Sequence, residues 1–166
     1  QQLNNDALTG ANNRRCFNGN LKTAFNLATN KQDWSFCCAM IDIDNFKSIN
    51  DNYGHVNWDS VLQRISEILS QFSKNYSPTK VFRYGWEEFA ILSRLPADKI
   101  EAMLNEILEY LKHNPILLDN QEVTLSFSAW VTNFNKKYHK EAINIVDQSA
   151  RKLCLAKKQL NSQVII

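Results

Sequence analysis

The chain has 166 residues, of which 44% are hydrophobic and 22% are charged. This length suits one domain with its own core, and this composition argues against wholesale disorder. Lysine and arginine number 19 against 17 aspartate and glutamate, so the net charge is +2. That balance gives no support to a strongly basic nucleic-acid binder, and we expect a single domain over residues 1–166 with no nucleic-acid partner.

The cysteines indicate a reducing compartment. No CxxC pair is present, which argues against a zinc site, and Cys37 and Cys38 sit inside an apolar run over 35–41. We interpret them as free core thiols and expect a cytoplasmic location. No apolar run approaches the ~20 residues of a membrane helix, so we expect no membrane span in this segment. The chain opens on Gln1 rather than methionine, and we expect it to be a fragment of a longer protein.

Hydrophobic periodicity predicts helices and strands in alternation. In chain order, the pattern predicts a helix over 14–29, a strand over 35–43, a helix over 56–72, strands over 80–85 and 88–93, a helix over 97–112, a strand over 122–131, a helix over 140–158 and a strand over 162–166. Gly85 and Trp86 read as the turn of a hairpin. The predicted fold class is α/β of the α+β type, with a mixed, largely antiparallel five-stranded sheet flanked by helices.

Carboxylates gather where two predicted strands meet their turns. The strand over 35–43 ends near Asp42 and Asp44, which alternation places on one face, and the strand over 88–93 begins beside Glu87 and Glu88. If these strands are neighbours, the carboxylates converge, and a divalent cation such as Mg²⁺ would relieve their repulsion. The alternative is a set of solvated charges at strand ends.

The segment after Asp44 carries groups suited to a nucleotide. Lys47 can meet a phosphate, and the start of a short helix offers backbone N–H groups to it. Asn50 and Asp59 can offer donors and acceptors to a base edge, and a carboxylate can accept both N–H groups of guanine. The alternative is that these residues are caps and turns, which Asn, Asp and Gly favour.

Four blocks, taken together, resemble the GGDEF domain of bacterial diguanylate cyclases. They are Asp6-Ala7-Leu8-Thr9-Gly10 with Asn13-Arg14-Arg15; Asp42-Ile43-Asp44-Asn45-Phe46-Lys47-Ser48-Ile49-Asn50-Asp51 with Gly54-His55 and Asp59; Arg83-Tyr84-Gly85-Trp86-Glu87-Glu88-Phe89-Ala90-Ile91-Leu92; and Val123-Thr124-Leu125-Ser126 with Leu153 and Ala156-Lys157. The blocks occur in the family's order and cover nearly the whole chain.

The resemblance implies a nucleotidyltransferase that condenses two GTP into cyclic di-GMP. It implies that Mg²⁺ (or Mn²⁺) binds at Asp42, the Ile43 carbonyl, Glu87 and Glu88, and that Glu87 also assists deprotonation of the 3′-hydroxyl as the catalytic residue. Phosphate contacts correspond to Phe46, through its backbone, Lys47 and Lys157. Guanine contacts correspond to Asn50 and Asp59, with Leu62 lining that pocket. Each domain holds one GTP, so a homodimer is needed for catalysis, and an upstream sensory or regulatory domain is an expected partner.

The chain also departs from the family pattern. The signature reads Gly85-Trp86-Glu87-Glu88-Phe89, with Trp86 where a second glycine is usual, and Trp58 replaces the glycine before Asp59. The usual Gly-Arg-Asn-Arg end reads Leu160-Asn161-Ser162-Gln163, and Tyr76-Ser77-Pro78-Thr79 stands where the family's inhibitory product site lies, so we expect no such site. We expect Trp86 to strain the turn and impair activity. The alternative is an inactive regulatory module that binds GTP or a protein partner.

Overall fold

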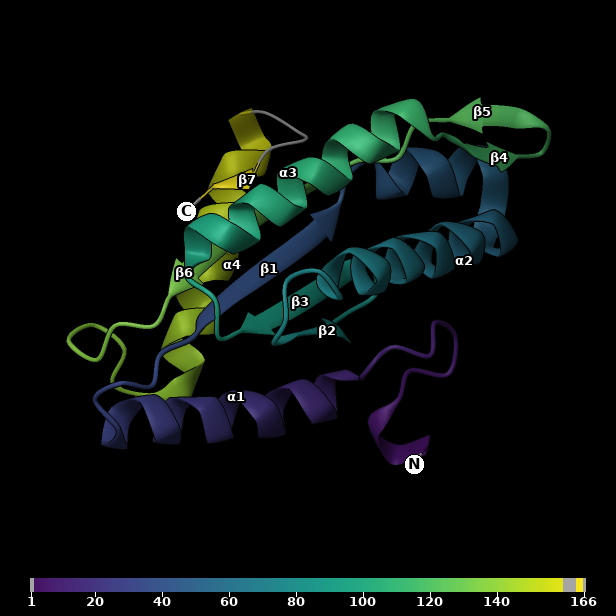
Figure 1. Ribbon diagram of the computed structural model, residues 1–166. Coiled ribbons are helices and arrows are strands. Elements are labelled where there is room, and N and C mark those ends of the chain that lie inside the picture. The colour runs from purple at the N-terminus through teal and green to yellow at the C-terminus, as the bar shows by residue number, and fades with distance from the viewer. Residues whose placement is uncertain (1, 160–163, 166) are drawn as a thin grey trace.

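The computed structural model describes residues 2–159, 164 and 165. Figure 1 shows a twisted sheet with helices on both sides. The helices are α1 (Arg14–Asn30), α2 (Phe46–Ser73), α3 (Ala97–His113) and α4 (Ala142–Gln159), with a 3₁₀ turn at Gln2–Asn4. The strands are β1 (Cys37–Ile43), β2 (Thr79–Arg83), β3 (Glu88–Ser93), β4 (Ile116–Leu118), β5 (Gln121–Val123), β6 (Phe127–Asn133) and β7 (Val164–Ile165).

Five strands form the main sheet in the order β2-β3-β1-β6-β7. All neighbouring pairs are antiparallel except β6 and β7, which are parallel. The predicted fold class is therefore confirmed, as is the hairpin that joins β2 to β3. The central strand β1 is almost continuously apolar because both of its faces are covered by helices.

Two apolar cores lie on opposite faces of this sheet. Helices α2 and α3 cover one face, and they pack on alternate β1 residues, namely Cys37, Ala39, Ile41 and Ile43. Helices α1 and α4 cover the other face over Cys38 and Met40. By the same alternation, Asp42 lies on the α4 face at the end of β1.

The structure differs from the sequence prediction at two elements. The strand predicted over 122–131 is broken, because residues 121–123 pair with β4 in a separate two-stranded sheet. Asp119 and Asn120 form the turn of this second hairpin, both with positive φ, which Asp and Asn tolerate best among residues other than glycine. The helix predicted over 56–72 starts ten residues earlier, and Gly54 interrupts it with a non-helical φ of 81°.

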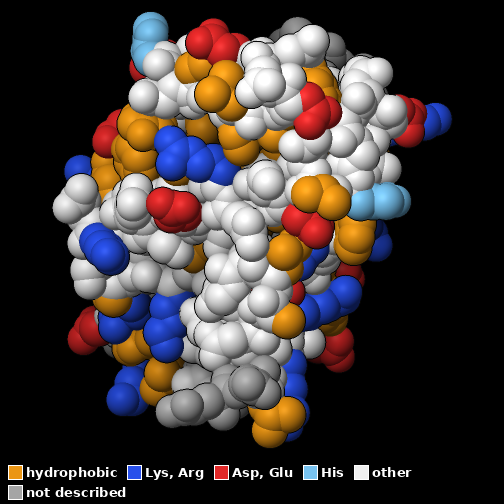
Figure 2. All heavy atoms as spheres, turned by 90° about the vertical axis from the view of Figure 1, so that its right-hand side faces the viewer, with side chains coloured by type: hydrophobic (Ala, Val, Ile, Leu, Met, Phe, Trp, Pro, Cys, Tyr) orange, Lys and Arg blue, Asp and Glu red, His pale blue; other side chains and the backbone are white. Residues whose placement is uncertain are grey.

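Within the residues that the structure describes, none of the helices combines the length and the apolar composition needed to cross a lipid bilayer. Figure 2 shows acidic, basic and apolar side chains intermixed over one face of the molecule, without a field of one charge. That mixture agrees with the small net charge of the whole chain.

The buried thiols give a first testable prediction. Cys37 and Cys38 are fully buried, and burial raises the pKa of the Cys37 thiol to about 12, whereas Cys154 is exposed. We expect a thiol reagent to label Cys154 rapidly in the native protein and to label Cys37 and Cys38 about a thousandfold more slowly or less, because their reaction requires opening of the core. Peptide mapping by mass spectrometry against a urea-denatured sample measures this. Rapid native labelling of Cys37 would contradict the placement of β1.

Candidate metal and nucleotide site

The pairing of β1 with β3 brings the predicted acidic residues to one place. Asp42 lies directly opposite Glu88 in the register. The Ile43 amide donates a hydrogen bond of 3.0 Å to the Glu87 carbonyl, which fixes the turn before β3 against the end of β1. The convergence of Asp42 with Glu87 and Glu88 therefore follows from the backbone of two strands and does not depend on long side chains.

An ammonium group from α4 reaches into this cluster. The Lys157 Nζ lies 3.1 Å from Oδ1 of Asp42 and 3.5 Å from Oδ1 of Asp44. It also donates a hydrogen bond of 3.4 Å to the Ile43 carbonyl. Lys157, which the resemblance assigns to phosphate, thus binds the oxygen atoms of Asp42 and Ile43 that the resemblance assigns to a metal.

Two serine hydroxyl groups hold the Asp44 carboxylate next to the Lys157 ammonium. Its side chain is buried, with the residue 2% exposed, and it accepts hydrogen bonds of 2.9 Å from Ser126 Oγ and from Ser128 Oγ. The alternation Ser126-Phe127-Ser128 at the start of β6 puts both hydroxyls on the Asp44 side. The serine pair therefore fixes a buried carboxylate directly beneath Lys157, and only the tertiary structure shows this role.

The carboxylates of Asp42, Glu87 and Glu88 repel one another. Burial raises the pKa of Asp42. The Lys157 ammonium lowers this pKa in part, and the charge of Asp44 raises it further. Burial and the charges of Asp42 and Glu88 raise the pKa of Glu87, and burial and Asp42 raise that of Glu88. The single ammonium of Lys157 therefore compensates the cluster only in part, and a second cation at this edge would be favoured.

The donors fit a hard divalent cation by their chemistry, because all are oxygen atoms. The Asp42 carboxylate and the Ile43 carbonyl already share one cationic group, the Lys157 ammonium. In the described part of the chain, no three acidic, histidine or cysteine side chains converge closely enough to enclose an ion. Binding of Mg²⁺ by Asp42, Glu87 and Glu88 would therefore require rotation of these side chains and displacement of Lys157.

Arg83 connects the signature turn to the N-terminal segment. Its guanidinium forms an ion pair with Asp6, with Nη1 3.0 Å from Oδ2, and donates hydrogen bonds to the carbonyl oxygens of Gly85 and Trp86. Asp6 in turn accepts hydrogen bonds from the amide and hydroxyl of Thr9. Burial raises the Asp6 pKa, but the bonds from Thr9 and Arg83 outweigh it, so the pKa lies below its usual value. In the sequence, Arg83 and Asp6 stand out only as parts of motifs, and their positioning role is evident only in the tertiary structure.

Trp86 lies at the tip of the signature turn without the expected backbone strain. Positive φ among described residues other than glycine is confined to Asn45, Asp119 and Asn120, so the strain expected for Trp86 is absent. The indole is 52% exposed, and its ring centroid lies 6.5 Å from that of Phe46. Trp86 therefore covers the start of α2 as an exposed aromatic surface.

Trp58 explains how the second departure from the family pattern is accommodated. Its indole is fully buried, and its ring centroid lies 4.8 Å from that of Phe46, edge to face. The Phe46 ring is therefore placed between the indoles of Trp58 and Trp86. These three rings form a continuous aromatic wall from the core to the signature turn.

The proposed nucleotide residues lie along α2 on both sides of its interruption at Gly54. Lys47 is exposed in the first turn, while Asn50 is partly buried, with an Oδ1 atom that is buried and has no hydrogen-bond partner. Asp59 is partly buried beyond Gly54, and Leu62 is fully buried in the core. The unpaired Asn50 oxygen fits a ligand N–H donor, whereas Leu62 supports this region from below.

The hairpin of β4 and β5 holds the interrupted part of α2. Tyr53 donates a hydrogen bond of 2.9 Å to Gln121, and Asn57 donates one of 3.1 Å to Asp119. These bonds fix both sides of Gly54, and thereby the angle between the α2 segments that carry Asn50 and Asp59. The sequence signal for this hairpin is the Asp119-Asn120 pair directly after the apolar residues Ile116–Leu118, and the strand predicted over 122–131 did not take it into account.

Two further stretches stand out in the sequence, namely 160–163 and 76–79. Leu160-Asn161-Ser162-Gln163 lies outside the described residues. At the position of the inhibitory product site, the Tyr76 hydroxyl donates to Glu106, and the Thr79 hydroxyl donates to the Tyr76 carbonyl. This stretch is therefore tied to α3 and to its own turn.

Comparison with known proteins places this geometry in a family. The family described as "Diguanylate cyclase, GGDEF domain" matches residues 3–163. The chain belongs to the GGDEF domain family. Its GGDEF domain is 36% identical over 132 residues to the uncharacterised protein YhcK of Bacillus subtilis, covering 77% of this chain and 36% of that protein. It is 30% identical over 128 residues to diguanylate cyclase A of Treponema denticola, covering 76% of this chain and 34% of that protein.

A solved structure shares the fold of this GGDEF domain. The GGDEF domain of DgcB from Caulobacter crescentus, in complex with c-di-GMP, superposes with a TM-score of 0.89 at 24% identity, covering 99% of this chain and 95% of that one. The GGDEF domain described here spans about a third of the length of the two sequence relatives.

The close approach at Gly85 gives a prediction for the GGDEF site. A Cβ atom at Gly85 would overlap Oε1 of Glu88 and would approach its Cδ to 3.3 Å. Gly85→Ala should therefore push the Glu88 carboxylate away from Asp42 and weaken Mn²⁺ binding about tenfold or more. Calorimetric titration with Mn²⁺ measures this. Gly19→Ala in α1 is the matched control, because its Cβ would meet nothing within 4 Å; unchanged Mn²⁺ affinity in Gly85→Ala would contradict the site.

The raised pKa values predict how the metal response of the GGDEF domain depends on pH. Asp42, Glu87 and Glu88 take up protons at higher pH in the folded than in the unfolded chain. Without metal, their contribution to the free energy of unfolding therefore falls as pH rises through the raised pKa values. Mn²⁺ competes with these protons, so the Mn²⁺-induced rise in Tm should be largest at pH values above the raised pKa values and should vanish as the pH falls through them.

Glu87→Gln tests the charge repulsion within the cluster at a single residue. Removing this charge should raise the Tm of the metal-free domain, because Glu87 is repelled by Asp42 and Glu88, and should reduce the Mn²⁺-induced shift. Scanning calorimetry with and without Mn²⁺ checks both effects. A lower metal-free Tm in Glu87→Gln would show that the cluster is already neutralised.

Proposed function

We propose that this GGDEF domain condenses two molecules of GTP into cyclic di-GMP with release of pyrophosphate, at a low rate. The observation that supports it best is the β1–β3 register, which sets Asp42 opposite Glu88 beside the Ile43 carbonyl and Glu87. A cluster of oxygen donors at a strand end, next to a helix start that carries Lys47, is suited to a nucleoside triphosphate with its metal. The name of diguanylate cyclase A of Treponema denticola agrees with this activity.

The residues divide into binding and proton-handling roles. Asp42, the Ile43 carbonyl, Glu87 and Glu88 would hold Mg²⁺ or Mn²⁺. When bound, this cation supplies charge stabilisation for the phosphates and for the attacking 3′-oxygen. Glu87 is partly exposed, and its raised pKa makes its carboxylate a stronger base for the proton of the 3′-hydroxyl.

The Lys157 ammonium can contact either the carboxylates of the cluster or the phosphates of a nucleotide. It compensates Asp42 and Asp44 in this structure, and a bound cation would repel it from Asp42. Its side chain can then meet phosphate oxygens, together with Lys47 and the backbone N–H of Phe46 at the start of α2. Lys157 would thus exchange one set of anionic oxygens for another as the nucleotide enters.

The guanine would lie along α2. The unpaired Oδ1 of Asn50 can accept a hydrogen bond from a base N–H, and the partly buried carboxylate of Asp59 can accept two more. Since a domain of this kind binds one GTP, two copies must face each other as a homodimer for the two transfers. An upstream sensory or regulatory domain would control that pairing, in the cytoplasm where GTP is available.

An inactive regulatory module is the second candidate, and Trp86 is the observation that favours it. The bond from Arg83 to the Trp86 carbonyl holds the backbone of the signature turn, and the exposed indole contacts Phe46. An aromatic side chain there reduces the room for two nucleotides between facing domains. The domain would then bind GTP, or a partner, without turnover.

A paired assay separates these functions. The domain is incubated with GTP and Mg²⁺ at high protein concentration beside Trp86→Gly, and the nucleotides are separated by chromatography. We expect slow cyclic di-GMP formation by the unmodified chain and an increase of about tenfold or more in Trp86→Gly, equivalent to about 1.4 kcal/mol in the barrier. Glu88→Gln should abolish product in both backgrounds.

Binding of a non-hydrolysable GTP analogue completes the test. Mg²⁺-dependent binding with no product from either protein would support the regulatory module. Absence of both binding and product would overturn the nucleotide site itself. Absence of product from the unmodified chain alone would assign the block to the indole and leave the catalytic residues intact.

A further inference from the structure

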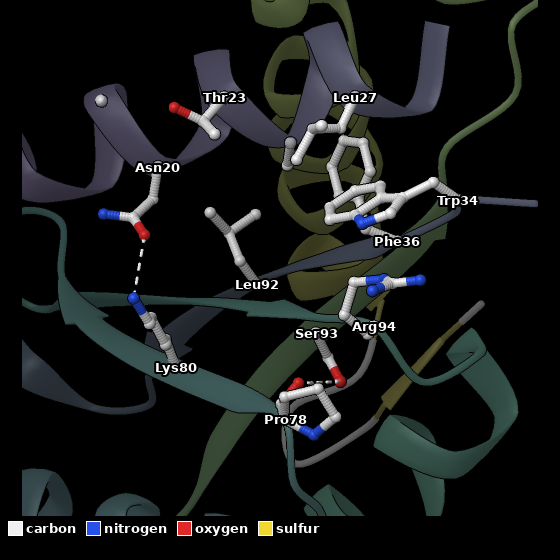
Figure 3. Close-up of a pocket in the computed structure, with 12 residues that line it drawn as sticks. Asn20, Thr23, Leu27, Trp34, Phe36, Pro78, Lys80, Leu92, Ser93 and Arg94 are labelled. Carbon is white, nitrogen blue, oxygen red and sulfur yellow. Dashed lines mark hydrogen bonds between the residues drawn. The ribbon is translucent and has the colours of Figure 1, made fainter. Parts of the chain in front are cut away.

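A cavity of about 290 Å³ opens on the α1 side of the sheet, at the far ends of β2 and β3 (Figure 3). One wall is α1, and the opposite wall is the outer edge of the sheet where β3 ends. The segment between α1 and β1 closes one end through Trp34. The lining comes from all three regions and includes Thr23 and Leu27 of α1, Trp34 and Phe36 of the segment before β1, and Leu92 and Arg94 at the end of β3.

The interior of the cavity is apolar and one of its ends is flat. Leu27, Phe36 and Leu92 line its depth. At one end the Arg94 guanidinium stacks on the indole of Trp34, 4.1 Å from the ring centroid, and its Nε donates a bond of 3.0 Å to the Ser35 carbonyl. These two contacts hold a planar cationic surface in place, which reduces the entropy that a ligand would have to pay for ordering it.

The charge of the lining is of one sign. Its two ionisable residues are Lys80 and Arg94, and no acidic residue lines the cavity. Lys80 donates its hydrogen bond of 3.2 Å to the neutral amide oxygen of Asn20. Neither cation pairs with a carboxylate in the described part of the chain, so both remain available to an anion at opposite ends of the cavity (Figure 3).

We propose that this cavity is a binding site for a small organic anion with a flat apolar body, such as an aromatic carboxylate. The volume lies at the lower end of ligand pockets, which limits the body to about one or two rings. The Trp34 and Phe36 rings and the leucines favour that body, and Arg94 or Lys80 favours a carboxylate at its rim. A cationic or uncharged ligand would leave the positive rim uncompensated.

This site is separate from the nucleotide site. It lies where β3 ends at Ser93, whereas Glu88 and the signature turn stand at the other end of the same strand. None of its lining residues belongs to the proposed metal or guanine set. The inference therefore goes beyond the proposed function and holds or fails independently of cyclase activity.

The probe is 2-naphthoate, titrated into the whole domain and followed by calorimetry and by amide NMR. The uncharged 2-naphthalenemethanol has the same rings, and octanoate has the same charge on a flexible chain. We expect saturable binding of 2-naphthoate about tenfold tighter than that of either comparison ligand, with shifted resonances at Thr23, Leu27 and Leu92. Higher salt should weaken binding of the naphthoate but not of the alcohol.

Substitutions of Lys80 and Arg94 test which of the two cations binds the carboxylate of the ligand. Lys80 and Arg94 are exposed, so Lys80→Met and Arg94→Met should fold, and at least one should reduce naphthoate affinity about tenfold while leaving the alcohol unchanged. Lys99→Met, on α3 at the other face, is the matched control and should have no effect. Equal binding of naphthoate and alcohol, shifts confined to α2 or α4, or no saturation at millimolar concentrations would each overturn the proposal. Equal binding of octanoate would overturn the flat-body requirement.

Discussion

Electrostatic repulsion between carboxylates at the ends of β1 and β3 governs the site. The register forces Asp42 and Glu88 to face each other, and hydrogen bonds in the core of the sheet maintain that register. Burial and mutual repulsion raise the pKa values of these groups, and the Lys157 ammonium offsets only part of the charge. The fold therefore stores a local cost that a bound cation would relieve, as functional sites commonly do.

Hydrogen bonds and ion pairs from several directions hold the backbone and the supports around the cluster. Ser126 and Ser128 fix Asp44 beneath Lys157, so the ammonium has a defined position. Arg83 fixes the signature turn to Asp6 by an ion pair and two bonds to backbone carbonyls. Strands, a helix and the N-terminal segment thus meet around one turn, and the geometry of Glu87 and Glu88 depends on all of them.

The two tryptophans at positions where the sequence analysis expects glycine have opposite structural consequences. Trp58 is absorbed into the core and supports Phe46 from below, whereas Trp86 remains half exposed above the same ring. Trp58 therefore packs under the start of α2 although its buried indole N–H has no hydrogen-bond partner, whereas Trp86 changes the surface that a nucleotide or a facing domain would meet.

The sequence by itself determined the order of the main elements, the hairpin at Gly85, and the placement of Asp42 and Asp44 on one face, because apolar periodicity and strand alternation are local properties. It also carried the motifs of the GGDEF family. Only the tertiary structure decided the Lys157 contacts, the bridge from Arg83 to Asp6, and the burial of Trp58, since each joins residues that are distant in the chain. The tertiary structure also decided the start of α2 and the β4–β5 hairpin. Contacts from Gln121 and Asp119 hold both sides of the interruption at Gly54 in α2. No local sequence pattern encodes such contacts.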